Sequence, residues 1–273
     1  MQGSNKWRWV ERDFFTDLRF LASQRNLAWQ LYLADIAENK RNSGLGLIAP
    51  FASVLLHVLL LGSVMGLVFH ETLTTFIPFF AISFSLWQGI SIFVSDVSYA
   101  NEKSTRYISF PNISGYISNL ISTYEFLVAL LLKIIASFIV IMFINPVIML
   151  NADYLGFVLG LSLLTFAMIS WSLPIAYIFD RFRLLRGFLP QILFAIYLIT
   201  PILWTPDRMQ SHQWVVDFNP IYHLVEVARS PIINGSISTL SCFVVLGLIG
   251  IGIVLSYILF PVNRNLVVYR WVA

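Results

Sequence analysis

Long stretches without a charged residue are the feature of this sequence that most constrains its fold. No Asp, Glu, Lys or Arg occurs between Arg41 and Glu71. Five further gaps of this kind cover residues 71–96, 133–153, 153–180, 186–207 and 229–264. Each gap has room for the ~20 apolar helical residues that cross about 30 Å of hydrocarbon. We therefore predict six membrane-spanning helices, over Leu47–Phe69, Thr75–Val94, Leu120–Ile144, Leu155–Phe179, Phe188–Trp204 and Leu240–Phe260.

The composition supports an integral membrane protein whose fold class is all-α. Hydrophobic residues make up 58% of the 273 residues and charged residues only 11%, whereas soluble domains carry about 25% charged residues. Any one apolar run could be a buried helix of a soluble protein, but six runs leave too little polar residue to cover a globule. This composition excludes a disordered chain and a nucleic-acid-binding domain. Because the net charge is only +3, any basic patch must be local. We expect a single transmembrane domain over residues 1–273.

The basic residues set the expected orientation in the membrane. Apart from Lys133, Arg208 and Arg229, all of the 17 Lys and Arg residues lie before the first span, after the last span, or in links on that same side. Basic residues concentrate on the cytoplasmic side of membrane proteins. We therefore expect a multi-pass protein of the plasma (inner) membrane whose termini are both cytoplasmic.

Two segments on the cytoplasmic side are candidates for contacts with a partner. Residues 22–44 are predicted to form an amphipathic helix, because Trp29, Leu33 and Ile36 recur at helical spacing with charges on the other face. Residues 96–111 form a polar link that is too long for a tight turn and has room for a short protruding helix. A simple interfacial anchor and a flexible loop are the alternatives that remain open for these two segments.

The connection between the fifth and sixth spans, residues 205–239, is predicted to form a re-entrant helical hairpin on the outer side. Asn219 followed by Pro220 is typical of a helix start, because Asn caps a helix and Pro fits its first turn. Arg229 follows Glu226 by three residues, so the two side chains share a helical face and can pair. We expect Asn219, Pro220, Glu226 and Arg229 to form an outer gate. The alternatives are a helix resting on the outer leaflet and an Arg229 that snorkels to the headgroups.

No motif for catalysis or cofactor binding occurs in the chain. The Gly-rich phosphate-binding loop, the Gly-x-Ser-x-Gly elbow and the His-Glu-x-x-His zinc motif are all absent. The histidines are scattered without ligand spacing, so structural roles are favoured over metal binding. The single cysteine, Cys242, excludes an intramolecular disulfide. His57 and Lys133 lie within spans and are therefore functional candidates whose roles stay open. We expect no enzyme activity and no cofactor in this chain.

Aromatic residues make up 15% of the sequence, and some of them are candidates for lining a transport path. Aromatic rings offer flat, shallow contact surfaces that suit the C–H faces of sugars. The candidates are Phe84, Trp87, Phe138, Trp171 and Trp204. Helix packing and interfacial belts are the alternative roles for most aromatic residues of the spans.

Several short motifs occur in a fixed order along the chain. Residues 35–46 read Asp-Ile-Ala-Glu-Asn-Lys-Arg-Asn-Ser-Gly-Leu-Gly, and residues 181–184 read Arg-Phe-Arg-Leu. Residues 200–204 read Thr-Pro-Ile-Leu-Trp, Phe-Asn-Pro at 218–220 precedes Arg229 and Pro231, and the tail has Tyr-Arg-Trp at 269–271. In this order the motifs resemble the membrane subunit of type-two ATP-binding-cassette exporters. The specific resemblance is to the polysaccharide branch, which comprises the O-antigen, capsule and teichoic-acid export permeases.

This resemblance implies a half-transporter that moves a lipid-linked polysaccharide out of the cytoplasm. The chain is then expected to form a homodimer among membrane lipids and to bind two separate ATPase subunits, which hold the ATP and Mg²⁺; no nucleic acid is involved. Residues 22–44 would be the interface helix and 96–111 the coupling segment. The expected partner-interface residues are Asp35, Lys40, Arg41, Leu45, Gly46, Asn101, Glu102 and Arg106.

Two other functions remain as alternatives. One is a small-molecule or lipid exporter permease of the same superfamily; such permeases commonly carry a large outer domain between the first two spans, which has no room here. The other is a membrane-embedded glycosyl or phosphoglycosyl transferase. Acidic residues stand on the required side for that function, but without a recognisable motif. Neither the glycan, its lipid carrier nor the ATPase follows from the sequence.

Overall fold

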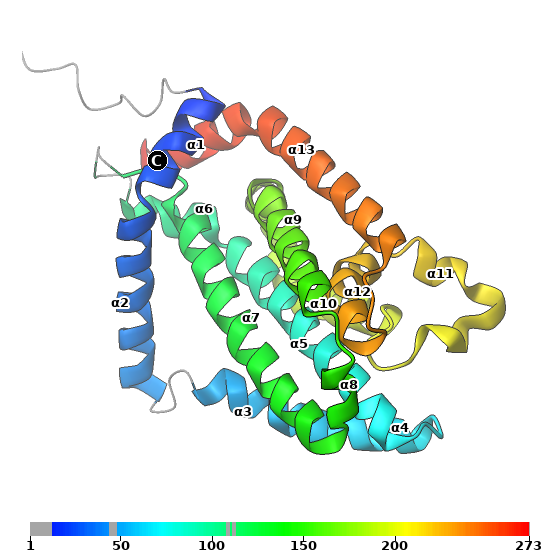
Figure 1. Ribbon diagram of the computed structural model, residues 1–273. Helices are drawn as coiled ribbons and strands as arrows, with labels where there is room; N and C mark the ends of the chain where they lie inside the picture. Colours follow the sequence, from blue (N-terminus) through cyan, green and yellow to red (C-terminus); the bar gives the residue numbers. More distant parts are fainter. Residues whose placement is uncertain (1–12, 44–47, 108–109, 111–112, 273) are drawn as a thin grey trace, which may run out of the picture.

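Every regular element in the described part of the chain is a helix (Figure 1). The computed structural model describes residues 13–43, 48–107, 110 and 113–272. Helices account for 86% of the structure, and no strand occurs among the described residues. The prediction of an all-α integral membrane protein is confirmed at this level.

The N-terminal region forms two helices, α1 (Phe14–Ser23) and α2 (Arg25–Ser43). The two helices meet at Gln24, close to residue 22, where the interface helix was predicted to begin. Ala28 and Tyr32 form the buried face of α2 and pack near the beginning of α7 (Ile117–Ile144). Trp29 and Leu33 of the predicted apolar face are 37% and 40% exposed, and their placement at a membrane surface stays a prediction. The small side chain of Ala28 allows α2 to approach α7 closely, which leaves the larger residues on the outside.

The first predicted span is a helical stretch with a wider turn in its middle. It consists of α3 (Ile48–His57), a π-helical turn over Val58–Gly62 and α4 (Ser63–Val68). Only Phe69–Thr72 separate α4 from α5 (Leu73–Val97). This short connection leaves no room for a folded domain between the first two spans.

Helices α5 and α7 form the centre of the bundle. Of the candidate spans, α5 is buried most completely inside the chain, and its apolar core includes Phe80, Leu86 and Phe93. A polar strip also joins the two helices, in which the hydroxyl groups of Ser85 and Ser137 lie 2.7 Å apart. Hydroxyl pairs of this kind tie membrane helices together because lipid offers polar groups no partner.

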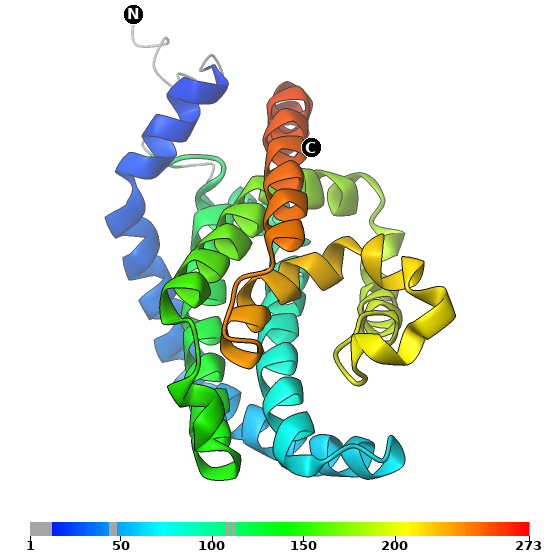
Figure 2. The same ribbon diagram turned by 45° about the vertical axis from the view of Figure 1, so that its right-hand side comes forward.

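The remaining helices surround this centre and define two ends of the bundle (Figures 1 and 2). They are α6 (Ala100–Ser104), α8 (Pro146–Leu150), α9 (Tyr154–Arg181), α10 (Leu184–Ile199), α11 (Trp214–Asp217), α12 (Pro220–Ile233) and α13 (Thr239–Val272). Helices α1 and α6 and the end of α13 lie at one end, which we call the α6 end. Helices α4 and α8 lie at the opposite end, which we call the α4 end.

Five of the described helical stretches are long and apolar enough to cross a membrane. They are Phe51–Val68, Leu73–Val97, Ile117–Ile144, Tyr154–Arg181 and Thr239–Asn263. The predicted span Phe188–Trp204 differs, because α10 has 16 residues and ends at Ile199. At 1.5 Å per residue this is about 24 Å, less than the ~30 Å of a full crossing. The helix stops there because Thr200 precedes Pro201, and a residue before proline disfavours helical geometry.

The hairpin predicted at 205–239 contains a short helical segment (Pro206–His212), α11 and then α12. Residues His223 to Ile232 of α12 are all buried, and α12 packs against α5, α9 and α13. This burial agrees with a helix held inside the bundle. The re-entrant path through the membrane stays a prediction.

Gly160 of α9 makes the tightest approach between α9 and α12. A Cβ atom at this position would lie 2.2 Å from the carbonyl oxygen of Val227. We expect Gly160→Ala to force the two helices apart and to lower the thermal midpoint by about 5 °C, because overpacking costs about 1–3 kcal/mol. Gly187→Ala in α10 is the matched control, since nothing lies within 4 Å of its Cβ position. Fluorescence-detected melting in detergent measures both, and an equal loss in the control would contradict this explanation.

Candidate coupling face and outer hairpin

A network of buried polar side chains connects α6 to helices that are distant in sequence. Asn101 of α6 is 1% exposed. Its Nδ2 donates to Oδ1 of Asn263 in α13 at 2.6 Å and to Oδ2 of Asp180 in α9 at 3.4 Å. The amide of Asn263 donates back to Oδ1 of Asn101 at 3.3 Å. Buried amides paired in this way hold three helices in one register.

Charged pairs extend this network to two more helices. Lys103 of α6 pairs with Asp96 at the end of α5, and Asp96 also accepts from the hydroxyl of Ser122 in α7. Arg186 of α10 donates to Glu102 of α6 at 2.8 Å and lies 3.6 Å from the carboxylate of Asp180. Together, the pairs and amides connect α6 to α5, α9, α10 and α13.

The charged side chains of α6 and of the residues after it influence Asp35 of α2. Burial raises the pKa of Asp35 above its ordinary value, while the charges of Lys103 and Arg106 oppose this rise. Burial also raises the pKa of Tyr107, and the negative charge of Asp35 adds to the effect. Leu31 and Ile36 of α2 pack with Tyr107 against one hydrophobic cluster, so α2 and the segment around α6 lie on the same face, which we call the coupling face.

The residues expected at a partner interface fall into three groups. Asp35, Glu102 and Arg106 are exposed on the coupling face. Lys40 and Arg41 belong to α2, but their side chains, like Leu45 and Gly46 as a whole, lie outside the described part of the chain. The expectation is wrong for Asn101, because this buried side chain bonds inside the chain and presents no surface to a partner.

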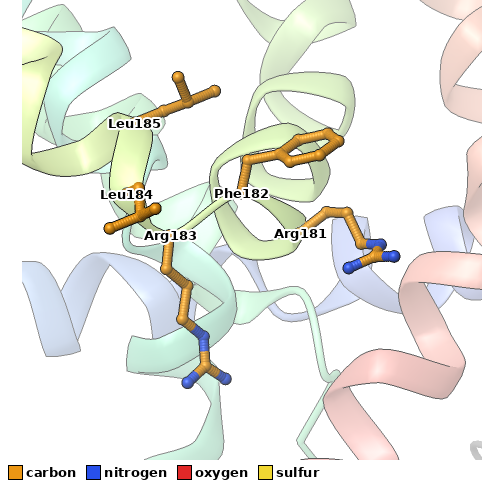
Figure 3. Close-up of a pocket in the computed structure, with 5 residues that line it drawn as sticks. All are labelled: Arg181, Phe182, Arg183, Leu184 and Leu185. Atoms are coloured by element: carbon orange, nitrogen blue, oxygen red, sulfur yellow. The ribbon is translucent and has the colours of Figure 1, made fainter.

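The turn between α9 and α10 adds two arginines at the same end of the bundle. Arg181, Phe182, Arg183, Leu184 and Leu185 line an open hollow of about 660 Å³ there. Figure 3 shows Arg181 and Arg183 extending in different directions from the turn. Asp180, which precedes this turn, is buried. A hydrogen bond to Asn101 connects Asp180 to α6, and an ion pair with Arg186 connects it to α10.

The outer hairpin is fixed at Asn219. The side-chain oxygen of Asn219 accepts from the backbone N–H groups of Ile221 and Tyr222 at 2.9 and 3.2 Å. Its Nδ2 donates to the hydroxyl of Thr200 at 3.0 Å. The expected helix cap is present, with Pro220 as the first residue of α12. The bond from Asn219 to Thr200 connects the start of α12 to the end of α10.

Arg229 is the most completely enclosed charge of the hairpin, with 2% exposure. Its Nε donates to Glu226 at 2.8 Å, so the expected pair is present. Its Nη1 donates to the hydroxyl of Ser83 in α5 at 2.9 Å and to the carbonyl of Pro201 at 2.7 Å. The guanidinium also lies 4.3 Å from the ring centroid of Phe79. A side chain held by these groups inside the bundle does not snorkel to the headgroups.

Two further residues of the hairpin, His223 and Arg208, make polar contacts that the sequence analysis did not assign. Nε2 of the buried His223 lies 2.9 Å from the carbonyl oxygen of Asp217, and its Nδ1 lies 3.1 Å from the hydroxyl of Ser241. Arg208, in the short helical segment Pro206–His212, donates to Glu71 in the α4–α5 turn at 3.1 Å. The sequence signal that could have indicated these contacts is the occurrence of single polar residues at the ends of apolar segments.

The aromatic residues expected along a transport path are mainly packed within the chain. Phe84 and Trp87 of α5 are 5% and 6% exposed. The ring of Phe84 stacks on His57 and that of Trp87 on Tyr197 of α10. In this conformation both rings serve helix packing, and their use as a path lining stays a prediction.

The other three aromatic candidates are half-buried. The ring of Phe138 lies 5.4 Å from that of Phe157. The indole N–H of Trp171 donates to the carbonyl of Leu248 at 2.9 Å, and that of Trp204 to the carbonyl of Leu198 at 3.0 Å. Their use as a path lining stays a prediction.

The polar groups of these sites bond one another across helices. Among the described residues, no group of three or more His, Cys, Asp and Glu side chains is placed to hold a metal ion. Lys133 is 3% exposed and bonds to the side-chain oxygen of Gln88 across α5 and α7. The charged groups are instead paired between helices, which suits elements that move together.

The comparison with known families matches these features to a transport protein. Residues 26–233, which run from α2 to the end of α12, match the family described as ABC-2 type transporter. No curated protein matches the chain. The matched domain is a transport membrane domain that is not itself catalytic and normally works with ATPase partners. It gives no support to a transferase function. With its apolar helices, the chain is a multi-pass membrane protein that belongs to the ABC-2 type transporter family.

Proposed function

We propose that this chain is the channel-forming membrane subunit of an ATP-driven exporter for a lipid-linked polysaccharide. Two copies form the path across the plasma (inner) membrane, and two ATPase subunits bind at the coupling face. Both termini and the α6 end then lie in the cytoplasm, and the outer hairpin lies at the far side. ATP and Mg²⁺ bind only to the partner subunits.

The observation that carries this proposal is the bonding of α6. This helix contains five residues, yet its side chains bond to α5, α9, α10 and α13. A partner that pushes on the exposed Glu102 or Arg106 therefore moves four helices through charged and amide contacts. Such bonded contacts transmit a displacement because packed helices shift as units rather than deform continuously.

The polysaccharide cargo rests on a smaller set of observations. The connection Phe69–Thr72 between α4 and α5 is short, and a large outer domain at this place is common in small-molecule and lipid exporters of the superfamily. The motif order of the sequence supports the glycan branch as well. An exporter of small molecules or lipids is the second candidate, favoured by the packed state of Phe84 and Trp87.

A cell that lacks this chain tests the cargo. We expect a lipid-linked polysaccharide to accumulate on the cytoplasmic side of the membrane, because synthesis continues while export stops. Extraction of membrane lipids followed by glycan gel analysis measures the accumulation, and wild-type chain restores surface polymer. Unchanged surface polymer, together with accumulation of a small lipid or solute, would favour the second candidate.

A further inference from the structure

An apolar groove at the α6 end of the bundle is not used by the proposed transport mechanism. It has a volume of about 520 Å³ and lies between α1, α7, α9 and α13. Helix α1 covers it, since Phe14 and Leu21 pack against Tyr116, Leu173 and Phe260. The ring of Phe14 makes edge contacts with both Tyr257 and Phe260 at 5.7 and 5.4 Å.

The groove changes in polarity along its length. Toward the middle of the candidate spans its walls are apolar, with Phe166, Ile169, Ile249 and Ile253. Two serines there are already bonded: Ser170 donates to the carbonyl of Ala167, and Ser256 donates to the carbonyl of Ser170, both at 2.8 Å. This part of the groove therefore suits a hydrocarbon chain, because the hydroxyl groups of both serines already donate hydrogen bonds within the protein.

The end of the groove near α1 contains an unused hydrogen-bond acceptor. Asn119, in the first turn of α7, is 7% exposed, and its side-chain oxygen has no hydrogen-bond partner. A buried amide oxygen without a partner costs about 1–3 kcal/mol, so a ligand that donates a hydrogen bond there is favoured. Asp17 of α1 lines the same end and is 5% exposed.

The charges of the lining select the kind of donor. Among the described residues that line the groove, Asp17 is the one charged residue, and no Lys, Arg or His occurs. A headgroup with a net negative charge therefore finds no counter-charge among the described lining residues. The ammonium group of a zwitterionic headgroup can instead donate a hydrogen bond to the side-chain oxygen of Asn119. Hydrogen bonds from a charged donor are about twice as strong as those between neutral groups.

We propose that the groove binds a phospholipid with a primary ammonium headgroup, of the phosphatidylethanolamine class. Its acyl chain lies along α9 and α13, and its ammonium group donates to Asn119 beneath α1. The groove lies apart from the α6 network, and this proposal does not depend on the identity of the cargo. The bound lipid holds α1 against the bundle.

Lipid competition tests this site in the full-length chain. The chain is reconstituted in nanodiscs containing equal amounts of phosphatidylethanolamine and phosphatidylcholine with identical acyl chains, and retained lipid is counted by native mass spectrometry. Phosphatidylcholine has a trimethylated ammonium that cannot donate a hydrogen bond. We expect the wild-type chain to retain phosphatidylethanolamine about tenfold over phosphatidylcholine. Equal retention, or a preference for phosphatidylglycerol in a parallel mixture, would overturn the proposal.

Two variants separate the headgroup from the groove. Asn119→Leu removes the acceptor and is expected to abolish the preference between the two lipids. Ser172→Trp fills the groove and is expected to remove most retained lipid of both kinds. Ser162→Trp is the matched control, because Ser162 is an exposed residue of the same helix that does not line the groove. Equal lipid loss in Ser162→Trp and Ser172→Trp, or an unchanged preference in Asn119→Leu, would count against this site.

Discussion

Arg229→Ala is expected to destabilise the outer hairpin and to open a leak for small solutes. The guanidinium joins α12 to Ser83 of α5 and to the carbonyl of Pro201, and it neutralises Glu226. Its removal leaves Glu226 as a largely buried charge without its partner, which costs about 3–5 kcal/mol. Solute efflux from proteoliposomes and the thermal midpoint measure the two effects.

The exposed pair at the same side provides the control for Arg229. The side chains of Arg208 and Glu71 are 45% and 28% exposed, and surface pairs contribute only about 0–1 kcal/mol. Arg208→Ala is therefore expected to leave stability nearly unchanged. Arg229→Lys retains the charge but loses the forked contacts, so we expect an intermediate leak. A folded Arg229→Ala protein that retains solute and exports normally would refute the gate.

Asn101→Leu is expected to separate ATP hydrolysis from transport. The substitution keeps the volume of the side chain but leaves the amide of Asn263 and the carboxylate of Asp180 without this partner. The links from α6 to α9 and α13 are then lost, while the exposed docking residues stay in place. We expect ATP hydrolysis by the complex to persist while transport falls about tenfold, since each lost buried bond costs about 1–3 kcal/mol.

Thr105→Val provides the matched control for Asn101→Leu. The Thr105 hydroxyl bonds only to the carbonyl of Glu102 in its own segment, at 2.7 Å. Its loss leaves the described links between α6 and the spans intact, so transport is expected to stay near the wild-type rate. A parallel loss in both variants would show that general disturbance of this segment, rather than the buried network, reduces transport.

Most of the membrane helices could be predicted from the sequence, because charge-free segments of this length are typical of membrane-spanning helices. Five of the six predicted spans have described helical counterparts long enough to cross a membrane. The exception, α10, ends early at Thr200–Pro201. The proline was visible in the sequence, but apolarity continues past it to Trp204, and apolarity alone does not report where a helix stops.

The sequence predicted the contacts of the candidate site only where the two residues lie close together in the chain. The Asn219 cap and the Glu226–Arg229 pair are set by spacing within one helix, and both are present. The bonds of Arg229 to Ser83 and of Asn101 to Asn263 join residues far apart in the chain. Such pairs depend on how helices rotate about their axes, which no single-helix pattern determines. For the same reason Asn101 was assigned to the surface although it is buried.

Coupled ATP hydrolysis and glycan movement in proteoliposomes test the central claim most directly. The chain is reconstituted alone and with its ATPase partner, and both phosphate release and the appearance of lipid-linked glycan on the opposite side are followed. We expect no hydrolysis by the chain alone, and hydrolysis accompanied by glycan movement when the partner is present. Robust hydrolysis by the chain alone, or glycan movement without the ATPase, would contradict the assignment of this chain as the membrane half of an ATP-driven exporter.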